Sequence, residues 1–309
     1  MLHFLASRLL SALLVIFGVS TVVFLLIHIV PGDPVEVMLG EASQAADREA
    51  LRHALGLDLP LWTQLMNYYG HLLQFDLGTS LQSKRPIGDM MLEALPATAQ
   101  LALAGMVVAM LVAFPLGILA AVRKDTPLDS GAMAFSMLGI SIPHFWMGPL
   151  LILFFSLWLG WLPVSGRDDW ASLVLPALTL GTGLAAILSR MVRASLLEVL
   201  GEDFVRTARA KGLSESRVVL RHALRNALLP VITVLGLQLG TLLGGAVITE
   251  IVFSWPGVGQ MTIDAINRRD YPVVQACVLL ISLSYVGINT LTDLVYAWLD
   301  PRIRLAEDS

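Results

Sequence analysis

The chain alternates between long apolar stretches and shorter polar ones, and this pattern predicts its secondary structure. Six apolar windows are long enough for membrane-spanning helices, which need roughly 18 to 20 residues at about 1.5 Å per residue. Runs of about ten alternating polar and apolar residues are absent, so we expect helices rather than a membrane barrel. The predicted spans cover residues 9–30, 97–122, 130–159, 173–191, 227–249 and 273–299.

The third window contains Ile142-Pro143-His144, a sequence that could divide it into two spans. A window of this length cannot supply two crossings of about 20 residues each. We therefore expect one long helix with a kink at the proline. The predicted fold class is an all-α polytopic membrane protein with six transmembrane helices.

The connection between the first two spans is the longest. Residues 31–34 (PGDP) predict a turn that ends the first helix. Residues 47–55 are helix-like, and residues 61–75 carry apolar and aromatic side chains at helical spacing. The expected organisation is a first transmembrane helix (1–30), an outer helical segment (31–96), a core with five transmembrane helices (97–299) and a tail (300–309).

The composition and the distribution of charge predict how the chain is oriented in the membrane. The chain has 309 residues, of which 56% are hydrophobic and 14% charged. With the N-terminus inside, 13 of the 20 Lys and Arg residues lie on the inner side and 7 on the outer side. This bias predicts that both termini are cytoplasmic. The net charge of −4 gives no reason to expect a nucleic-acid partner.

The first apolar run is long for a signal peptide and lacks a small-x-small cleavage site, so we expect it to be retained. The single cysteine, Cys277, cannot form an internal disulfide. No spacing of His, Cys, Asp and Glu indicates a metal site, and no nucleophile with a nearby base indicates a catalytic site. We therefore expect no catalytic residues and no bound metal.

A charged island lies between the fourth and fifth spans. It extends from Glu202 to Gly212, and Glu202 and Asp203 precede Arg206 and Arg209 at spacings that allow ion pairs. Small side chains on one face of this segment would allow the surface of another protein to approach its backbone closely. The island either docks a soluble partner or is only a positively charged cytoplasmic loop.

The residues around the island predict a helical elbow. We expect residues 195–210 to continue the helix of the fourth span. Gly212 supplies the left-handed residue that ends a helix, and Ser214 can cap the next one. The elbow and its flanks, residues 198–225, should project from the membrane.

Four sequence blocks resemble the permease subunits of ATP-binding-cassette importers, in particular the dipeptide/oligopeptide/nickel permease group, whose members include dipeptide and glutathione permeases. They follow the family's order along the whole chain. The blocks are PGDP at 31–34, FDLGTS at 75–80, GEDFVRTARAKG at 201–212 with HALRNALLP at 222–230, and FSWPGVG at 253–259 with RDYP at 269–272. The Glu-Ala-Ala that opens the general importer motif corresponds here to Arg206-Thr207-Ala208, which weakens the transfer of a specific Glu contact from other importers.

The resemblance implies a type I importer permease fold with an additional first helix. Residues 202–217 would form the coupling loop on which a cytoplasmic ATPase docks. The residues that the resemblance assigns to this coupling are Glu202, Asp203, Arg206, Ala208, Gly212 and Leu213. The chain has no Walker A pattern, so ATP and Mg²⁺ would be bound by separate ATPase subunits, and this chain would need no cofactor and would not be an enzyme.

The implied partners are a second, related permease subunit, one or two cytoplasmic ATPase subunits, a periplasmic substrate-binding protein and the lipid bilayer. The location would be the bacterial inner membrane, with residues 31–96 in the periplasm. The implied function is import of dipeptides or oligopeptides. The same machinery could instead carry glutathione or nickel.

Polar and small residues within the last two spans are candidates for the translocation path. They either line a pore or pack helices closely together. These residues are Gln238, Thr241, Gly244, Gly245 and Asp293. A secondary transporter is the alternative from another class, but it would predict internal repeats and charged residues at the membrane midplane, and neither is evident.

Overall fold

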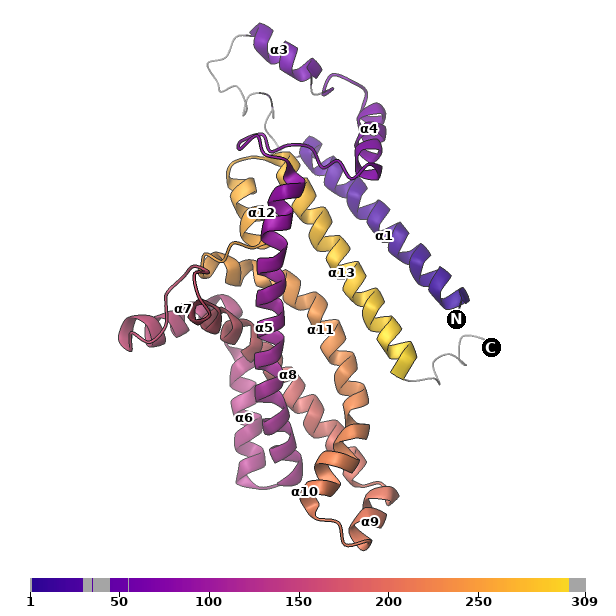
Figure 1. Ribbon diagram of the computed structural model, residues 1–309, viewed down its shortest axis with the longest axis vertical. Helices are drawn as coiled ribbons and strands as arrows, with labels where there is room; N and C mark the ends of the chain where they lie inside the picture. Colours follow the sequence, from indigo (N-terminus) through magenta and orange to yellow (C-terminus); the bar gives the residue numbers. More distant parts are fainter. Residues whose placement is uncertain (1, 30–34, 36–44, 55, 300–309) are drawn as a thin grey trace. The chain divides into compact units, whose positions relative to one another are not determined.

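The computed structural model describes residues 2–29, 35, 45–54 and 56–299 (Figure 1). These residues form helices, with one isolated antiparallel bridge between Thr79 and Pro86. The predicted all-α class is confirmed. The turn expected at residues 31–34 and the tail at 300–309 lie outside the described residues.

Packing divides the chain into two compact units. One comprises Met1–Ala97 with Pro256–Val286, and the other comprises Thr98–Trp255 with Gly287–Ser309. Helices α5 (Ile87–Val122) and α13 (Tyr271–Leu299) contribute residues to both units.

The first unit also contains α1 (Leu2–Ile29), α3 (Ala45–Ala54), α4 (Leu61–Leu73) and α12 (Val258–Asn267). Helices α3 and α4 confirm the two short helices expected after the first span. In α4, the aromatic side chains pack on α1: the rings of Tyr69 and Phe17 stack at 5.2 Å, and the Tyr69 hydroxyl lies 2.7 Å from Thr21 Oγ1. The outer segment is thus fastened to the first helix by aromatic and hydroxyl contacts.

The core of the first unit lies where α5, α12 and α13 begin. Helix α5 contributes Ile87, Met91 and Ala94 to it. Helices α12 and α13 supply the remaining buried side chains, which are Val258, Ala265, Val273, Ala276 and Cys277. This cluster fixes the short helix α12 against the first turns of two much longer helices.

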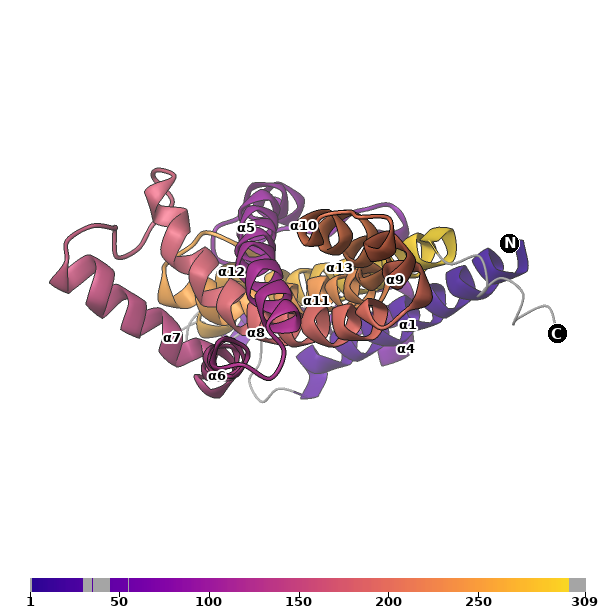
Figure 2. The same ribbon diagram turned by 90° about the horizontal axis from the view of Figure 1, so that it is seen from below.

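The second unit is built around α8 (Ala171–Leu200), which packs against α6 (Pro127–Ser141) and α11 (Leu224–Val252). Its shorter helical elements are α7 (His144–Leu151), the π-helical segment η1 (Ile152–Trp158), α9 (Asp203–Ala210), α10 (Glu215–Arg217) and the π-helical segment η2 (Val218–Ala223). Figure 1 shows α9 and α10 together at one end of the helices of this unit, and Figure 2 shows the two helices as neighbours.

Glycines allow α5 and α8 to approach closely. A Cβ atom on Gly117 would lie 2.7 Å from both the Ser189 carbonyl oxygen and Val192 Cβ. A Cβ atom on Gly181 would lie 2.8 Å from the Gly105 carbonyl oxygen. Small residues at helix contacts are typical of membrane proteins, where close packing replaces much of the hydrophobic driving force.

Four helical segments of the described chain are long and apolar enough to cross a membrane. They are Ile87–Val122, Ala171–Leu200, Glu215–Gly240 and Tyr271–Thr292, and they correspond to the second, fourth, fifth and sixth predicted spans. The first predicted span lies in α1, where the apolar stretch found is Leu10–Leu25, of 16 residues. The first span therefore stays a prediction.

The prediction of one continuous helix over residues 130–159 is wrong. Helix α6 ends at Ser141, Ile142 has an extended backbone (φ −90°, ψ 117°), and α7 begins after Pro143. Proline has no N–H to donate and disfavours helical geometry at the residue before it, so the ring ends α6 instead of only bending it. The six-helix count is thus not confirmed at this segment.

The close approach at Gly117 gives a prediction. We expect Gly117→Ala to destabilise the chain by about 1–3 kcal/mol, because the added methyl group would overlap a carbonyl oxygen. The matched control is Gly88→Ala in the same helix, where a Cβ atom would meet nothing within 4 Å. Thermal unfolding of the purified chain in detergent measures both. Equal midpoints for the two variants would contradict the packing account.

Candidate functional site

The charged island forms an elbow of two short helices. Helix α8 ends at Leu200, Glu202 has an extended backbone (φ −71°, ψ 150°), and α9 then begins at Asp203. The expected continuous helix over residues 195–210 is therefore wrong, because the chain changes direction at Gly201-Glu202. This break turns α9 away from the axis of α8 and makes it a separate element.

Gly212 ends α9 as predicted. Its φ of +78° lies in the left-handed region. The Gly212 N–H donates to the Arg209 carbonyl (2.9 Å), and the Leu213 N–H donates to the Ala208 carbonyl (3.4 Å). This pair of bonds is the Schellman arrangement, which favours glycine at the left-handed position. Ser214 precedes α10 as expected, but its side chain makes no capping hydrogen bond.

A hydrophobic cluster lies beneath the elbow. In α9, Val205 is fully buried and Ala208 is 8% exposed, one helical turn apart. They pack with residues from α5, α8, η2 and α11, namely Ala121, Leu196, Val218, Val219, Ala223 and Ala227. The elbow is therefore anchored to the ends of the long helices and cannot move independently of them.

Ion pairs fix the rest of the elbow. Arg209 Nε and Nη2 donate to the two carboxylate oxygens of Glu215 at 2.7 and 3.3 Å, which joins α9 to α10. Arg206 Nη1 lies 3.3 Å from Asp203 Oδ1 within α9. The predicted Asp203–Arg206 pairing is confirmed, whereas Arg209 pairs forward with Glu215. Such exposed pairs add little stability but orient the helices.

The six predicted coupling residues divide into two groups. Glu202, Asp203, Arg206 and Gly212 are exposed on the elbow. Ala208 faces the cluster beneath α9, and Leu213 is half-buried against the same cluster. The outer surface of the elbow thus carries charged side chains beside the exposed ring of Phe204, while its inner surface is apolar.

A second contact near the elbow was missed by the sequence analysis. Arg193 on α8 donates from Nε and Nη2 to both carboxylate oxygens of Asp129 on α6, each at 2.7 Å. The Asp125 N–H also donates to Asp129. Hydrogen bonding from Arg193 lowers the pKa of Asp129 below its ordinary value. Its sequence signal was Asp129 in the first turn after Pro127, a favourable position for an acid.

The proposed translocation residues lie on α11 and α13. Gln238 is half-buried on α11. Thr241, Gly244, Gly245 and Asp293 belong to these helices, but their packing lies outside the described part of the structure. A Cβ atom on the nearby Gly236 would overlap the side chain of Thr292, so these two helices pack closely at that point.

A polar group at the other end of α11 was also missed. Glu250 is fully buried, and Thr98 Oγ1 donates to its carboxylate at 2.7 Å. Nearby, Arg167 donates to Gln100 Oε1 at 2.8 Å and lies over the Trp255 ring at 5.6 Å. Glu250 directly follows the predicted span 227–249, and no local pattern predicts its burial. The fold instead brings it into the interior.

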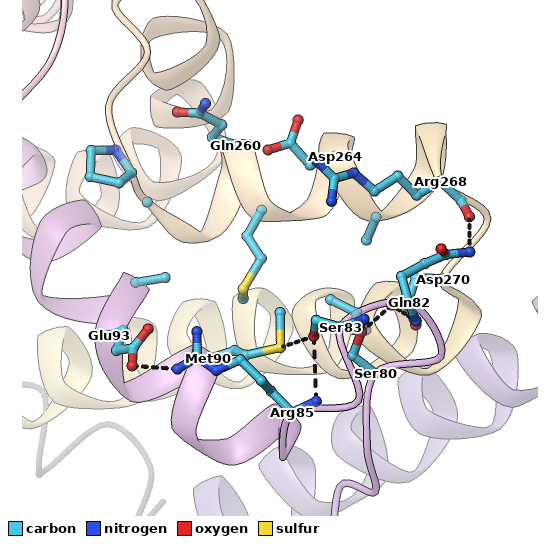
Figure 3. Close-up of a pocket in the computed structure, with 16 residues that line it drawn as sticks. Ser80, Gln82, Ser83, Arg85, Met90, Glu93, Gln260, Asp264, Arg268 and Asp270 are labelled. Atoms are coloured by element: carbon cyan, nitrogen blue, oxygen red, sulfur yellow. Dashed lines mark hydrogen bonds and ion pairs between the residues drawn. The ribbon is translucent and has the colours of Figure 1, made fainter.

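Two of the resembling sequence blocks meet in the first unit. Asp270 is 3% exposed and accepts hydrogen bonds from Ser80 Oγ (2.5 Å), Leu81 N–H (3.1 Å) and Gln82 N–H (3.3 Å) (Figure 3). These bonds hold the turn before α5 on the turn before α13. In the described part of the chain, no three His, Cys, Asp or Glu side chains are placed to hold a metal ion.

Comparison with known proteins identifies the family. Residues 113–305 match the family described as "Binding-protein-dependent transport system inner membrane component", and residues 1–102 match the N-terminal region of such membrane components. The chain belongs to this family of transport permeases. Two match regions cover nearly all of the permease, in agreement with the four ordered sequence blocks.

Curated relatives match over the full length. The permease is 46% identical over 304 residues to the glutathione transport system permease protein GsiC of Escherichia coli O6:H1, covering 98% of this chain and 99% of that one. It is 47% identical over 334 aligned residues to the di/tripeptide transport system permease protein DppB of Pseudomonas aeruginosa (strain UCBPP-PA14), with the same coverage.

Among solved structures, the permease resembles the inward-facing MetNI methionine ABC transporter. The TM-score is 0.59 at 19% identity, over 68% of this chain and 96% of that chain. At this identity the match shows the fold alone. The permease is a multi-pass inner-membrane subunit of an ABC importer. It works with ATPase and substrate-binding partners and is not itself an enzyme.

The Asp129–Arg193 contact predicts a pH dependence. Because the pKa of Asp129 is lower in the folded chain, the contact stabilises the fold above a pH of about 3.9 and is lost as the pH falls further. Asp129→Asn should lower the unfolding midpoint at pH 7, and its difference from the wild type should shrink in acid. Asp125→Asn, which changes an exposed carboxylate nearby, is the control. A constant difference at every pH would contradict this account.

Proposed function

We propose that this permease imports short peptides across the bacterial inner membrane. The observation that carries the proposal is its full-length similarity, at 46–47% identity, to a glutathione permease and to a di/tripeptide permease. Glutathione is itself a tripeptide, so both relatives handle cargo of one chemical class. The peptide class is therefore favoured over nickel.

The alignments favour glutathione as the first cargo to test. The alignment with GsiC spans 304 residues, close to the 309 of this chain. The alignment with DppB spans 334, more than this chain has residues, so that relative carries insertions. The overall length of this chain thus resembles that of the glutathione permease more closely.

The elbow is the proposed docking site for the ATPase, on residues 202–217. Glu202, Asp203 and Arg206 present charges outward, where a soluble partner can reach them. Ala208 and Leu213 would instead act indirectly, because they hold α9 on the cluster beneath it. A push on α9 would reach α8 and α11 through that cluster, since packed interiors transmit displacement.

Alternating access would follow from differential binding. ATPase subunits with bound ATP and Mg²⁺ would bind one arrangement of the coupling elbows more tightly and so shift the population of pore conformations. The pore would run along α11 and α13, near Gln238, Thr241, Gly244, Gly245 and Asp293. Small and polar residues on these helices suit a path for a polar cargo.

The positive-inside bias supports cytoplasmic termini, a periplasmic segment at 31–96 and a cytoplasmic elbow. A second, related permease subunit would complete the pore, and one or two kinds of ATPase would bind the two elbows. A periplasmic binding protein would deliver the cargo.

Reconstituted transport tests this function. The complex, purified from its native membrane into liposomes with its binding protein, should take up radiolabelled glutathione or di- and tripeptides only when ATP is present on the cytoplasmic side. A matched complex with a hydrolysis-deficient ATPase should show no uptake. Uptake of nickel with no uptake of any peptide would contradict the proposal.

Gly212 gives a prediction for coupling. A side chain at its φ of +78° is strained by about 1–2 kcal/mol, and more for a β-branched residue. Gly212→Val should therefore leave the protein inserted but lower transport at least about tenfold relative to ATP hydrolysis. Gly212→Asn should retain more transport, because asparagine tolerates the left-handed region. A normal transport rate for Gly212→Val at normal expression would rule out this role.

A further inference from the structure

A pocket in the first unit lies between the beginning of α5 and α12 (Figure 3). Its volume is about 350 Å³, within the usual range for small-molecule sites. The turn at residues 80–85 and the first turns of α5 form one wall, and α12 with the turn after it forms the other. The buried Asp270 fastens these walls together through the Ser80 turn.

Both walls carry charges of both signs. On the α5 wall, Arg85 Nη2 donates to Glu93 Oε1 at 2.5 Å. On the α12 wall, Asp264 and Arg268 are exposed and form no ion pair with any described residue. Figure 3 shows Asp264 and Arg268 on the side of the pocket opposite Arg85 and Glu93. A ligand in this pocket would meet a free carboxylate and a free guanidinium one helical turn apart.

Two methionines lie among these charges. Met90 and Met261 line the pocket, and Ser83 Oγ donates to the Met90 sulfur at 3.7 Å. Methionine is flexible and polarisable, so it adapts to apolar groups of different shape. The pocket thus combines fixed charges with an adaptable apolar surface.

The spacing of positions 264 and 268 along α12 is close to the length of a short peptide. Residues at i and i+4 of a helix have Cβ atoms about 6 Å apart. A dipeptide, at about 3.5 Å per residue, has its charged ends roughly 7 Å apart. A peptide ammonium group fits Asp264, and a peptide carboxylate fits Arg268, because guanidinium binds carboxylate through two parallel hydrogen bonds.

We propose that this pocket is an entry site that binds the charged ends of a short peptide, with Asp264 at the ammonium group and Arg268 at the carboxylate. This inference rests on the proposed peptide import and adds a peptide-binding site formed by residues of this chain. One wall of the pocket is the turn at residues 80–85, which belongs to the segment 31–96 that we propose to be periplasmic. The pocket would therefore lie on the side on which peptide arrives.

Equilibrium binding of radiolabelled dialanine to the complete complex in lipid nanodiscs, without ATP or binding protein, tests the site. Asp264→Asn and Arg268→Gln should each weaken binding about fivefold. The control is Arg269→Gln, which removes the neighbouring charge outside the pocket and should leave binding unchanged. The Arg268 backbone carbonyl, which accepts from Gln82, is kept in every variant.

Blocked peptides assign each end. N-acetylation of dialanine should weaken its binding to the wild type but cause little further loss in Asp264→Asn. C-terminal amidation should also weaken binding to the wild type but cause little further loss in Arg268→Gln. The site would be overturned if the losses from blocking the peptide and from the substitutions simply added. It would also be overturned if Arg269→Gln weakened binding equally, or if the wild type did not bind dialanine. A result in which the variants weaken only the docking of the substrate-binding protein would also overturn the site, because a loop of that protein would then fill the pocket.

Transport by the same preparations separates the two proposals. Peptide uptake by the wild type together with unaltered dialanine binding in both pocket variants would overturn the entry site and leave the proposed function intact. Absence of peptide uptake in the wild type would reject the function itself. Size-exclusion profiles and ATP hydrolysis identify any misfolded variant, and the two substitutions test the site independently.

Discussion

The apolar cluster beneath the elbow is the contact on which the proposed coupling depends. A short charged helix such as α9 is not stable alone in water, since isolated helices below about 12 residues are marginal. Val205 and Ala208 give it a buried face, and the cluster joins that face to α5, α8 and α11. Any force on α9 is therefore applied to the ends of long helices rather than to a loose loop.

The glycine and proline positions have unequal consequences along the chain. Gly212 ends α9 in the left-handed region, whereas Gly117 and Gly181 remove side chains so that α5 and α8 can approach. Pro143 separates α6 from α7, yet Pro176 and Pro230 lie within the continuous helices α8 and α11. Membrane helices tolerate proline where neighbouring groups satisfy the freed carbonyl.

Hydrophobic length and local turn chemistry were enough to predict the all-α class, the helices α3 and α4, and the left-handed Gly212. They failed at two local breaks in the helices, at Ile142-Pro143 and at Gly201-Glu202. They also could not find contacts between residues far apart in sequence. The pairs Asp129–Arg193 and Thr98–Glu250 join different helices, so no local pattern contains them.

Site-specific crosslinking on the elbow tests the central claim most directly. The chain's one cysteine, Cys277, is buried, so an introduced cysteine reports on its own position. In native membranes, Arg206→Cys on the exposed face of α9 should crosslink to a Walker-containing ATPase identified by mass spectrometry. Val205→Cys on the buried face of the same helix should not. A correctly inserted Arg206→Cys chain that purifies without any ATPase, crosslinked or bound, would contradict the docking of an ATPase on this elbow.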